Sequence, residues 1–198
     1  MNIIIKKLRF MTSNTFVKNV EHESAIKHVT GRAIYTDDIS EPRNLLHAAI
    51  GFSPVSKGII EKIDFSEVLK SDGVVDIITE GDIEGQNDVG PIFKGDKIFT
   101  SKKIEYHGQP IFAVIASSTK LARQALLKVK LKIKKQTPII TIEDAIKKKS
   151  FVLKSKTIKR GKSASAIANS KHRLSGKLEC GGQDHFYLEG QIAMTIPQ

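Results

Sequence analysis

The feature that most constrains the fold is a strand, a helix and a second strand that follow one another between residues 111 and 135. The run from Ile111 to Ala116 is short and apolar, as expected for a buried strand. The segment from Lys128 to Lys135 reads KVKLKIKK, and its alternation of Lys with apolar residues is typical of a half-buried strand. Between them a capping cluster, Ser117 to Thr119, precedes apolar residues at helical spacing. These are Leu121, Ala125, Leu126 and Val129.

Other short elements surround this unit and predict an α/β or α+β domain, because strands and helices interleave. We expect strands at Leu45–Ile50, Gly58–Phe65 and Val74–Thr79, and a short helix at Glu67–Lys70 capped by the Ser66 hydroxyl. Residues 80–98 are rich in Gly, Asp and Asn and predict a long loop.

The boundaries of the predicted domains follow from changes in composition. Residues 21–137 form the domain, and residues 1–20 form an N-terminal extension without a clear pattern. Residues 138–170 read as a linker whose helix begins at Thr141 and ends near Lys147 to Lys149. Residues 171–198 suggest two strands around a polar, aromatic-containing segment, and we interpret them as the beginning of a second, incomplete domain.

Charge and cysteine usage limit the possible functions. The net charge of +11 would favour nucleic acid if it were gathered on one face, but the lysines are scattered and the 128–135 run reads as a solvated strand face. The chain has one cysteine, Cys180, so it has no internal disulfide and no Cys-rich iron–sulfur or zinc cluster. We expect a cytoplasmic protein without a membrane span.

Several isolated residues are of types that bind metals or act in catalysis, but the sequence around them does not support either role. His22, Glu23 and His28 lack further ligands at a recognisable spacing, and neither His107 nor Cys180 has an identifiable activating partner. The glycine-containing loop at 80–98 has neither the spacing of a P-loop nor that of a dinucleotide fingerprint.

Three stretches in order resemble the molybdopterin-binding large subunit of bacterial two-subunit xanthine dehydrogenases, within the xanthine oxidase and aldehyde oxidase family. The first runs from His22 to Pro54, the second is EYHGQPIFAVIA from Glu105 to Ala116, and the third is GGQDHFYLEGQIA from Gly181 to Ala193. The resemblance implies an α+β chain: an α/β-hammerhead domain at 21–137, then the truncated start of a molybdenum-cofactor-binding domain at 171–198. One departure is Lys162, where the family usually has an acidic residue, and we expect it to alter only local helix capping.

The resemblance also implies roles for the GGQ motif. In this family the Gln hydrogen-bonds an oxo ligand of molybdenum, which makes Gln183 the candidate that reaches the metal indirectly, while Gly182 and Gly181 would let the backbone approach the cofactor. Composition alone favours a surface Gly-Gly turn with a solvated Gln. Asp184 and His185 are interpreted as structural rather than as an acid–base pair. We expect Phe186 and Tyr187 to pack, and Glu189 to satisfy a backbone or Arg partner.

The complete family enzymes oxidise hypoxanthine and xanthine to urate at molybdenum, with electrons passing through iron–sulfur clusters and FAD on a small subunit. No catalytic residue of the family falls within this chain, so we expect it to be inactive alone and not to retain the molybdenum–molybdopterin cofactor. Its partners would be the iron–sulfur/FAD small subunit and the remainder of the molybdenum subunit, with no nucleic acid and no membrane. The alternatives are a stand-alone hammerhead domain that binds a protein or has no role, and a basic RNA-binding module, against which the lack of aromatics in KVKLKIKK argues.

Overall fold

The computed structural model describes residues 21–187 and 190–197. The chain divides into two units. One comprises Met1–Glu41 and Glu179–Gln198, and the other comprises Pro42–Leu178. The predicted N-terminal extension, residues 1–20, lies outside the described residues. In the first unit the described elements are helix α1, Ala25–Val29, and a 3-10 turn, η1, at Thr36–Asp38.

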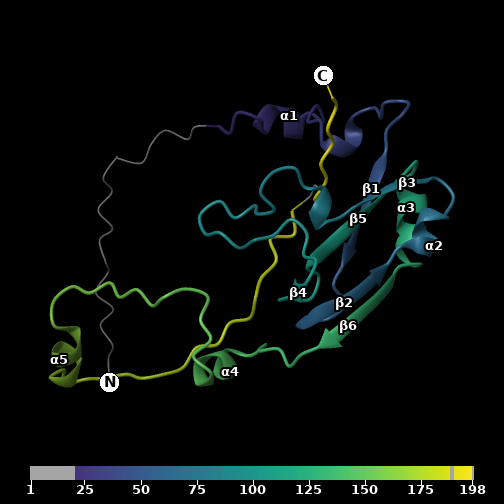
Figure 1. Ribbon diagram of the computed structural model, residues 1–198. Helices are drawn as coiled ribbons and strands as arrows, with labels where there is room; N and C mark the ends of the chain where they lie inside the picture. Colours follow the sequence, from purple (N-terminus) through teal and green to yellow (C-terminus); the bar gives the residue numbers. More distant parts are fainter. Residues whose placement is uncertain (1–20, 188–189, 198) are drawn as a thin grey trace. The chain divides into compact units, whose positions relative to one another are not determined.

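The second unit contains two antiparallel sheets of three strands each (Figure 1). The first sheet has the order β1-β5-β3, where β1 is His47–Phe52, β5 is Pro110–Ala116 and β3 is Val74–Ile78. The second has the order β4-β2-β6, where β4 is Lys103–Ile104, β2 is Gly58–Asp64 and β6 is Lys130–Lys135. Because β5 is the central strand of its sheet, it is buried along most of its length.

Four helices and a turn complete the described part of this unit. They are α2, Ser66–Leu69; η2, Glu80–Asp82; α3, Thr119–Leu126; α4, Ile142–Lys147; and α5, Ser163–Ala168. Ser118 is the N-cap of α3, and its hydroxyl accepts a hydrogen bond from the Leu121 N–H, as the capping cluster predicted. Thr141 caps α4 in the same way through the Asp144 N–H, which confirms the predicted helix start. None of the helices among the described residues is long and apolar enough to cross a membrane.

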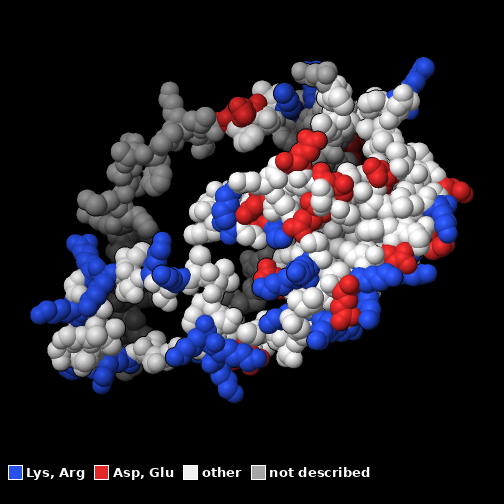
Figure 2. All heavy atoms as spheres, viewed as in Figure 1, with Lys and Arg blue, Asp and Glu red and all other residues white. Residues whose placement is uncertain are grey.

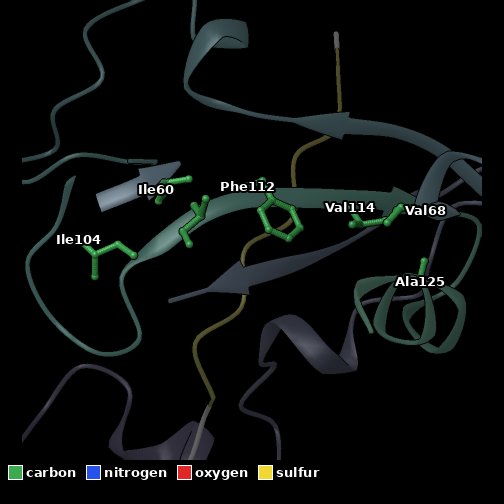
Figure 3. Packing of buried hydrophobic residues seen from close by; sticks show 7 residues of the cluster. Ile60, Val68, Ile104, Phe112, Val114 and Ala125 are labelled. Carbon is green, nitrogen blue, oxygen red and sulfur yellow. The ribbon is translucent and has the colours of Figure 1, made fainter. Parts of the chain in front are cut away.

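The core lies between α2, α3 and both sheets. Ile60 of β2, Val68 of α2, Phe112 and Val114 of β5 and Ala125 of α3 all belong to one buried cluster (Figure 3). Val68 and Val114 have no exposed surface, and Phe112 packs edge to face on Phe65 with ring centroids 5.0 Å apart. Complete burial of a Val or Phe side chain stabilises a fold by about 1.5–3 kcal/mol, so this cluster is the main source of the unit's stability.

The structure confirms most predicted elements and corrects others. The predicted strand at Leu45–Ile50 lies two residues later, because β1 pairs from His47 to Phe52 with β5. Ser66 does not cap α2: the helix begins after Phe65, and the Asp64 carboxylate instead accepts from the Ser66 N–H and hydroxyl. The pattern did not predict β4, which has only two residues and exists through its pairing with β2.

The two strands predicted within residues 171–198 are not present among the described residues of that segment. A strand is held by backbone hydrogen bonds to a neighbour, and neither sheet contains a strand from these residues. Alternating apolar residues such as Leu178 and Ile196 are exposed there. Phe186 is 93% exposed, so the packing expected of its ring does not occur among the described residues.

Candidate functional site

The GGQ motif lies in an irregular, exposed segment of the first unit. A Cβ atom added at Gly181 or at Gly182 would meet no atom within 4 Å, and neither glycine has a positive φ. Among the described residues, no other part of the chain packs against these two glycines, so no contact within the chain requires the absence of a side chain there. The side chain of Gln183 is exposed, so its amide is available to a group outside the described structure.

The residues after the motif do not form an acid–base pair. Phe186 has a φ of 46°, and its N–H lies 3.5 Å from the Asp184 carboxylate, which is a weak local contact. The Gln191 amide donates to the Tyr187 hydroxyl at 2.7 Å. Glu189 lies outside the described residues. Nothing in these contacts activates a proton or a nucleophile.

The other candidates singled out from the sequence are also local surface groups. The His22 Nδ1 atom accepts from the Ser24 N–H at 3.1 Å, and the His28 Nδ1 atom lies 3.2 Å from the Tyr35 hydroxyl. Cys180 is an exposed free thiol. Among the described residues, no group of three or more His, Cys, Asp and Glu side chains could hold a metal ion.

The most extensive polar network lies in the second unit, in the loop between β3 and β4, which confirms the predicted loop. Glu80 accepts hydrogen bonds from Lys97 Nζ at 2.6 Å, from Asn87 Nδ2 at 2.9 Å, and from both the N–H and the hydroxyl of Ser101. Asn87 in turn pairs with the backbone of Phe99: its Nδ2 donates to the Phe99 carbonyl at 2.7 Å, and its Oδ1 accepts the Phe99 N–H at 3.0 Å. These bonds hold the beginning and the end of the loop together.

Two carboxylates of this loop, those of Glu80 and Asp88, have lowered pKa values and are held ionised. The ammonium of Lys97, the Ser101 hydroxyl and the Asn87 amide lower the pKa of Glu80 from 4.5 to about 2. The backbone N–H groups of Gly90 and Gly95 lower the pKa of Asp88 below its ordinary value. A general acid or base works best with a pKa near the operating pH, so this network positions the loop and does not transfer protons.

Two shallow hollows lie on the second unit. One, of about 280 Å3, is lined by Lys62, Asp64, Lys130, Leu131 and Lys132 on β2 and β6. The other, of about 220 Å3, includes Glu105, Tyr106 and His107 beside Pro138 to Ile140. His107 lies in this hollow, and its ring has no hydrogen-bond partner among the described residues. Neither hollow is lined by a set of side chains that could catalyse a reaction.

Comparison with known proteins extends what the geometry shows. The model of the "Aldehyde oxidase and xanthine dehydrogenase, a/b hammerhead domain" family matches residues 30–137. Aldehyde oxidase 2 of Rattus norvegicus is 37% identical over 180 residues, which cover 90% of this chain and 13% of that protein. Xanthine dehydrogenase of Dictyostelium discoideum is 34% identical over 178 residues, with the same coverage of 90% and 13%.

A similar fold occurs in a solved structure. The aldehyde oxidoreductase from Desulfovibrio gigas matches with a TM-score of 0.55 and 32% sequence identity, over 62% of this chain and 15% of that chain. The chain therefore spans only about 13% of the length of the curated relatives that it matches. The match of the family model, residues 30–137, contains both sheets of the second unit.

Proposed function

This chain belongs to the aldehyde oxidase and xanthine dehydrogenase family, and from that membership we propose that it is the hammerhead-bearing part of a molybdenum-dependent xanthine dehydrogenase large subunit. The observation that carries the proposal is the match of the hammerhead model to residues 30–137, which contain every strand of both sheets. The proposed whole protein oxidises hypoxanthine and xanthine to urate as part of purine catabolism. It works in the cytoplasm, which is consistent with the single free cysteine.

A second substrate class has support from a specific observation. The similarity to aldehyde oxidase 2, at 37% identity, is at least as high as the 34% identity to xanthine dehydrogenase. Oxidation of an aldehyde is therefore the alternative activity of the whole protein. The hammerhead domain is common to both classes, so the substrate has to be decided by residues outside this chain.

The described residues do not by themselves form a site for a molybdenum cofactor. Gln183 supplies one exposed amide, the glycines beside it face open space, and no cluster of metal-ligating side chains lies among the described residues. We therefore derive no catalytic step from this chain. In the proposed protein, Gln183 and Gly182 contribute to a cofactor site that the remainder of the molybdenum subunit completes, and the chain alone neither retains the cofactor nor turns over substrate.

The proposal includes two partners: the remainder of the molybdenum subunit and a small subunit that carries iron–sulfur clusters and FAD. Iron–sulfur clusters are held by several cysteine thiolates and this chain has one cysteine, so the proposed clusters are bound by residues outside these 198. Nucleic acid and membrane are not among the proposed partners.

The first test is to sequence the gene beyond the codon for Gln198 and to express the complete reading frame with its small subunit. We expect oxidation of hypoxanthine and xanthine by the complete protein, and neither turnover nor bound molybdenum in the 198-residue chain. Faster oxidation of aldehydes than of purines would favour the alternative substrate class. If no family motif follows Gln198 in any frame, the chain is a stand-alone hammerhead domain with a protein-binding role or none.

The role proposed for Gln183 has its own test in the complete protein. Gln183→Ala should lower kcat while the molybdenum content and the thermal stability stay unchanged, because the side chain makes no contact that supports the described fold. Gln191→Ala is the matched control, since it also removes an amide from the same exposed segment. Equal loss of activity in both variants would contradict a special role of Gln183.

A further inference from the structure

Strand β6 is the longer free edge of the second sheet. In the order β4-β2-β6, β6 pairs only with β2, whereas the other edge, β4, has just two residues. The Gln136 N–H donates to the Lys57 carbonyl at 3.0 Å, toward β2. Because successive N–H groups of a strand point to opposite edges, the N–H groups of Leu131, Ile133 and Lys135 point away from the sheet. Among the described residues no strand pairs with them.

The two faces of this edge differ sharply. Leu131 and Ile133 are partly buried and pack against the core. Lys130, Lys132 and Lys134 are exposed on the opposite face, and Figure 2 shows basic side chains along the part of the molecule where Figure 1 places β6. A strand added to this edge would therefore meet lysines at every second position and apolar side chains at the positions between.

Acidic residues on β2 neutralise only part of the positive charge of these lysines. Lys130 lies opposite Asp64, and Lys132 contacts Glu61 at 3.1 Å, but Lys132 also lies opposite Lys62. Lys134 lies opposite Ile59, and among the described residues no acidic side chain is within 4.0 Å of its ammonium group. The face keeps an excess of positive charge, greatest at the end near Lys134.

This charge pattern selects the kind of strand that can pair. Exposed edge strands join other strands unless something prevents it, and lysines oppose the pairing of two identical edges because like charges would lie opposite each other. The same lysines attract a strand with acidic residues at the facing positions. We propose that β6 is a docking edge for an extended acidic segment of another polypeptide, in which Glu or Asp alternates with β-branched residues, added to the sheet beyond β6.

The test measures binding of a fluorescent synthetic peptide that alternates Glu with Val to the full 198-residue chain. We expect binding that weakens as salt is added, and slower hydrogen exchange at the amides of Leu131, Ile133 and Lys135. Two peptides separate pairing from simple charge attraction. One has Lys in place of Glu, and the other has N-methylated amides on alternate residues, so that it keeps the charge but cannot complete the ladder. Neither should bind.

Lys134→Glu is the decisive variant, because Lys134 contacts no charged group on β2 and its replacement leaves the ion pair of Lys132 intact. It should raise the dissociation constant of the acidic peptide by about three- to tenfold, since one attractive pair becomes repulsive. Lys154→Glu makes the same charge change in an exposed segment without a strand and should leave binding within about twofold.

Three results would overturn the proposal: no binding at low salt, equal binding of the N-methylated peptide, or equal weakening by Lys134→Glu and Lys154→Glu. Self-association of the chain through β6, seen as a dimer that Lys134→Glu changes, would show that a second copy occupies the edge and would also overturn it. None of these outcomes depends on the proposed molybdenum-enzyme function.

Discussion

Glu80, at the start of the long loop of the second unit, contacts residues in the middle and at the end of that loop. Lys97, Asn87 and Ser101 all donate to its carboxylate, and only a quarter of the side chain is exposed. Glu80→Gln keeps the size of the side chain but removes the charge that these donors favour. After allowance for solvent screening, we expect the free energy of unfolding at pH 7 to fall by about 1–2 kcal/mol. Urea unfolding of the parent chain and of Glu80→Gln measures this difference in the free energy of unfolding.

The pH dependence of this effect has a definite sign. The pKa of Glu80 is about 2 in the folded chain and near its ordinary value of 4.5 when unfolded, so folding favours the ionised carboxylate. Its contribution is fully present above pH 4.5 and is lost as the pH falls toward 2. The difference between Glu80→Gln and the parent chain should shrink over that range. Glu84→Gln, on an exposed residue of the same loop, is the control and should change stability little at any pH.

Gly51 of β1 is required by the aromatic ring beside it. A Cβ atom at this position would lie 2.2 Å from Cζ of Phe112, whose ring is buried and held edge to face by Phe65. Alanine normally suits a strand interior better than glycine, but here it forces the ring out of the core. Gly51→Ala should lower the free energy of unfolding by about 1–3 kcal/mol, measured by denaturant titration.

The control for this substitution is Gly85→Ala. A Cβ atom at Gly85 would meet nothing within 4 Å, and Gly85 does not have a positive φ. We therefore expect no loss of stability from Gly85→Ala. A similar loss in both variants would mean that the contact with Phe112 does not decide the need for glycine.

At the scale of elements, the same type of hydroxyl N-cap is expected to affect global stability in one helix and only local stability in another. Ser118 caps α3, which buries Ala122 and Ala125 against the sheet, whereas Thr141 caps α4, which buries no residue. Ser118→Ala should lower the global free energy of unfolding by about 1 kcal/mol. Thr141→Ala should loosen only α4 and leave the global transition unchanged, because α4 can unfold without opening the core. Thermal unfolding followed by circular dichroism compares them; equal shifts would contradict the difference in packing.

Elements with strong local signals were predictable from the sequence, and elements made by distant contacts were not. Strand β2 and the starts of α3 and α4 follow from period-two alternation and capping residues. Strand β4 and the pairing of Asn87 with Phe99 join residues that lie far apart in the chain, so no local pattern marks them. The segment after residue 171 has strand-like alternation without a partner strand, and alternation alone does not make a strand.

The candidate cofactor-binding residue was even less predictable from the local sequence pattern. Gln183 follows two glycines in a polar stretch, which by itself describes an ordinary turn, and only the resemblance of the GGQDHFYLEGQIA stretch singles it out. The contact that we propose for this amide involves groups outside this chain, so the local sequence contains no physical signal for it. The edge of β6 is different, since its alternation of Lys with Leu and Ile could be read directly.

At the scale of the whole chain, the burial of residues separates a packed region from an exposed region more clearly than the amino-acid composition does. Within the part of the chain that the structure describes, the buried hydrophobic residues all lie between Ala49 and Ala125, and every residue from Ile146 to Tyr187 is exposed. Proteases cut where the backbone opens easily, so the exposed region should be cleaved while the core is intact. The many lysines on both sides of this division give trypsin comparable sites in each part.

Limited trypsin digestion should therefore remove the region after residue 137 early and leave a resistant product that contains the second unit from Pro42 to the end of β6, identified by mass spectrometry. Gly51→Ala supplies the internal check, because a weakened core should shorten the lifetime of the resistant product without changing the rate of the first cuts beyond residue 137. A chain that resists trypsin uniformly would contradict this division, since it would require the exposed region to be covered by packing that the described residues do not show. Early cuts after Lys120 or Arg123 in α3, which buries Ala122 and Ala125, would contradict it equally, because the core would then be open before the tail was removed.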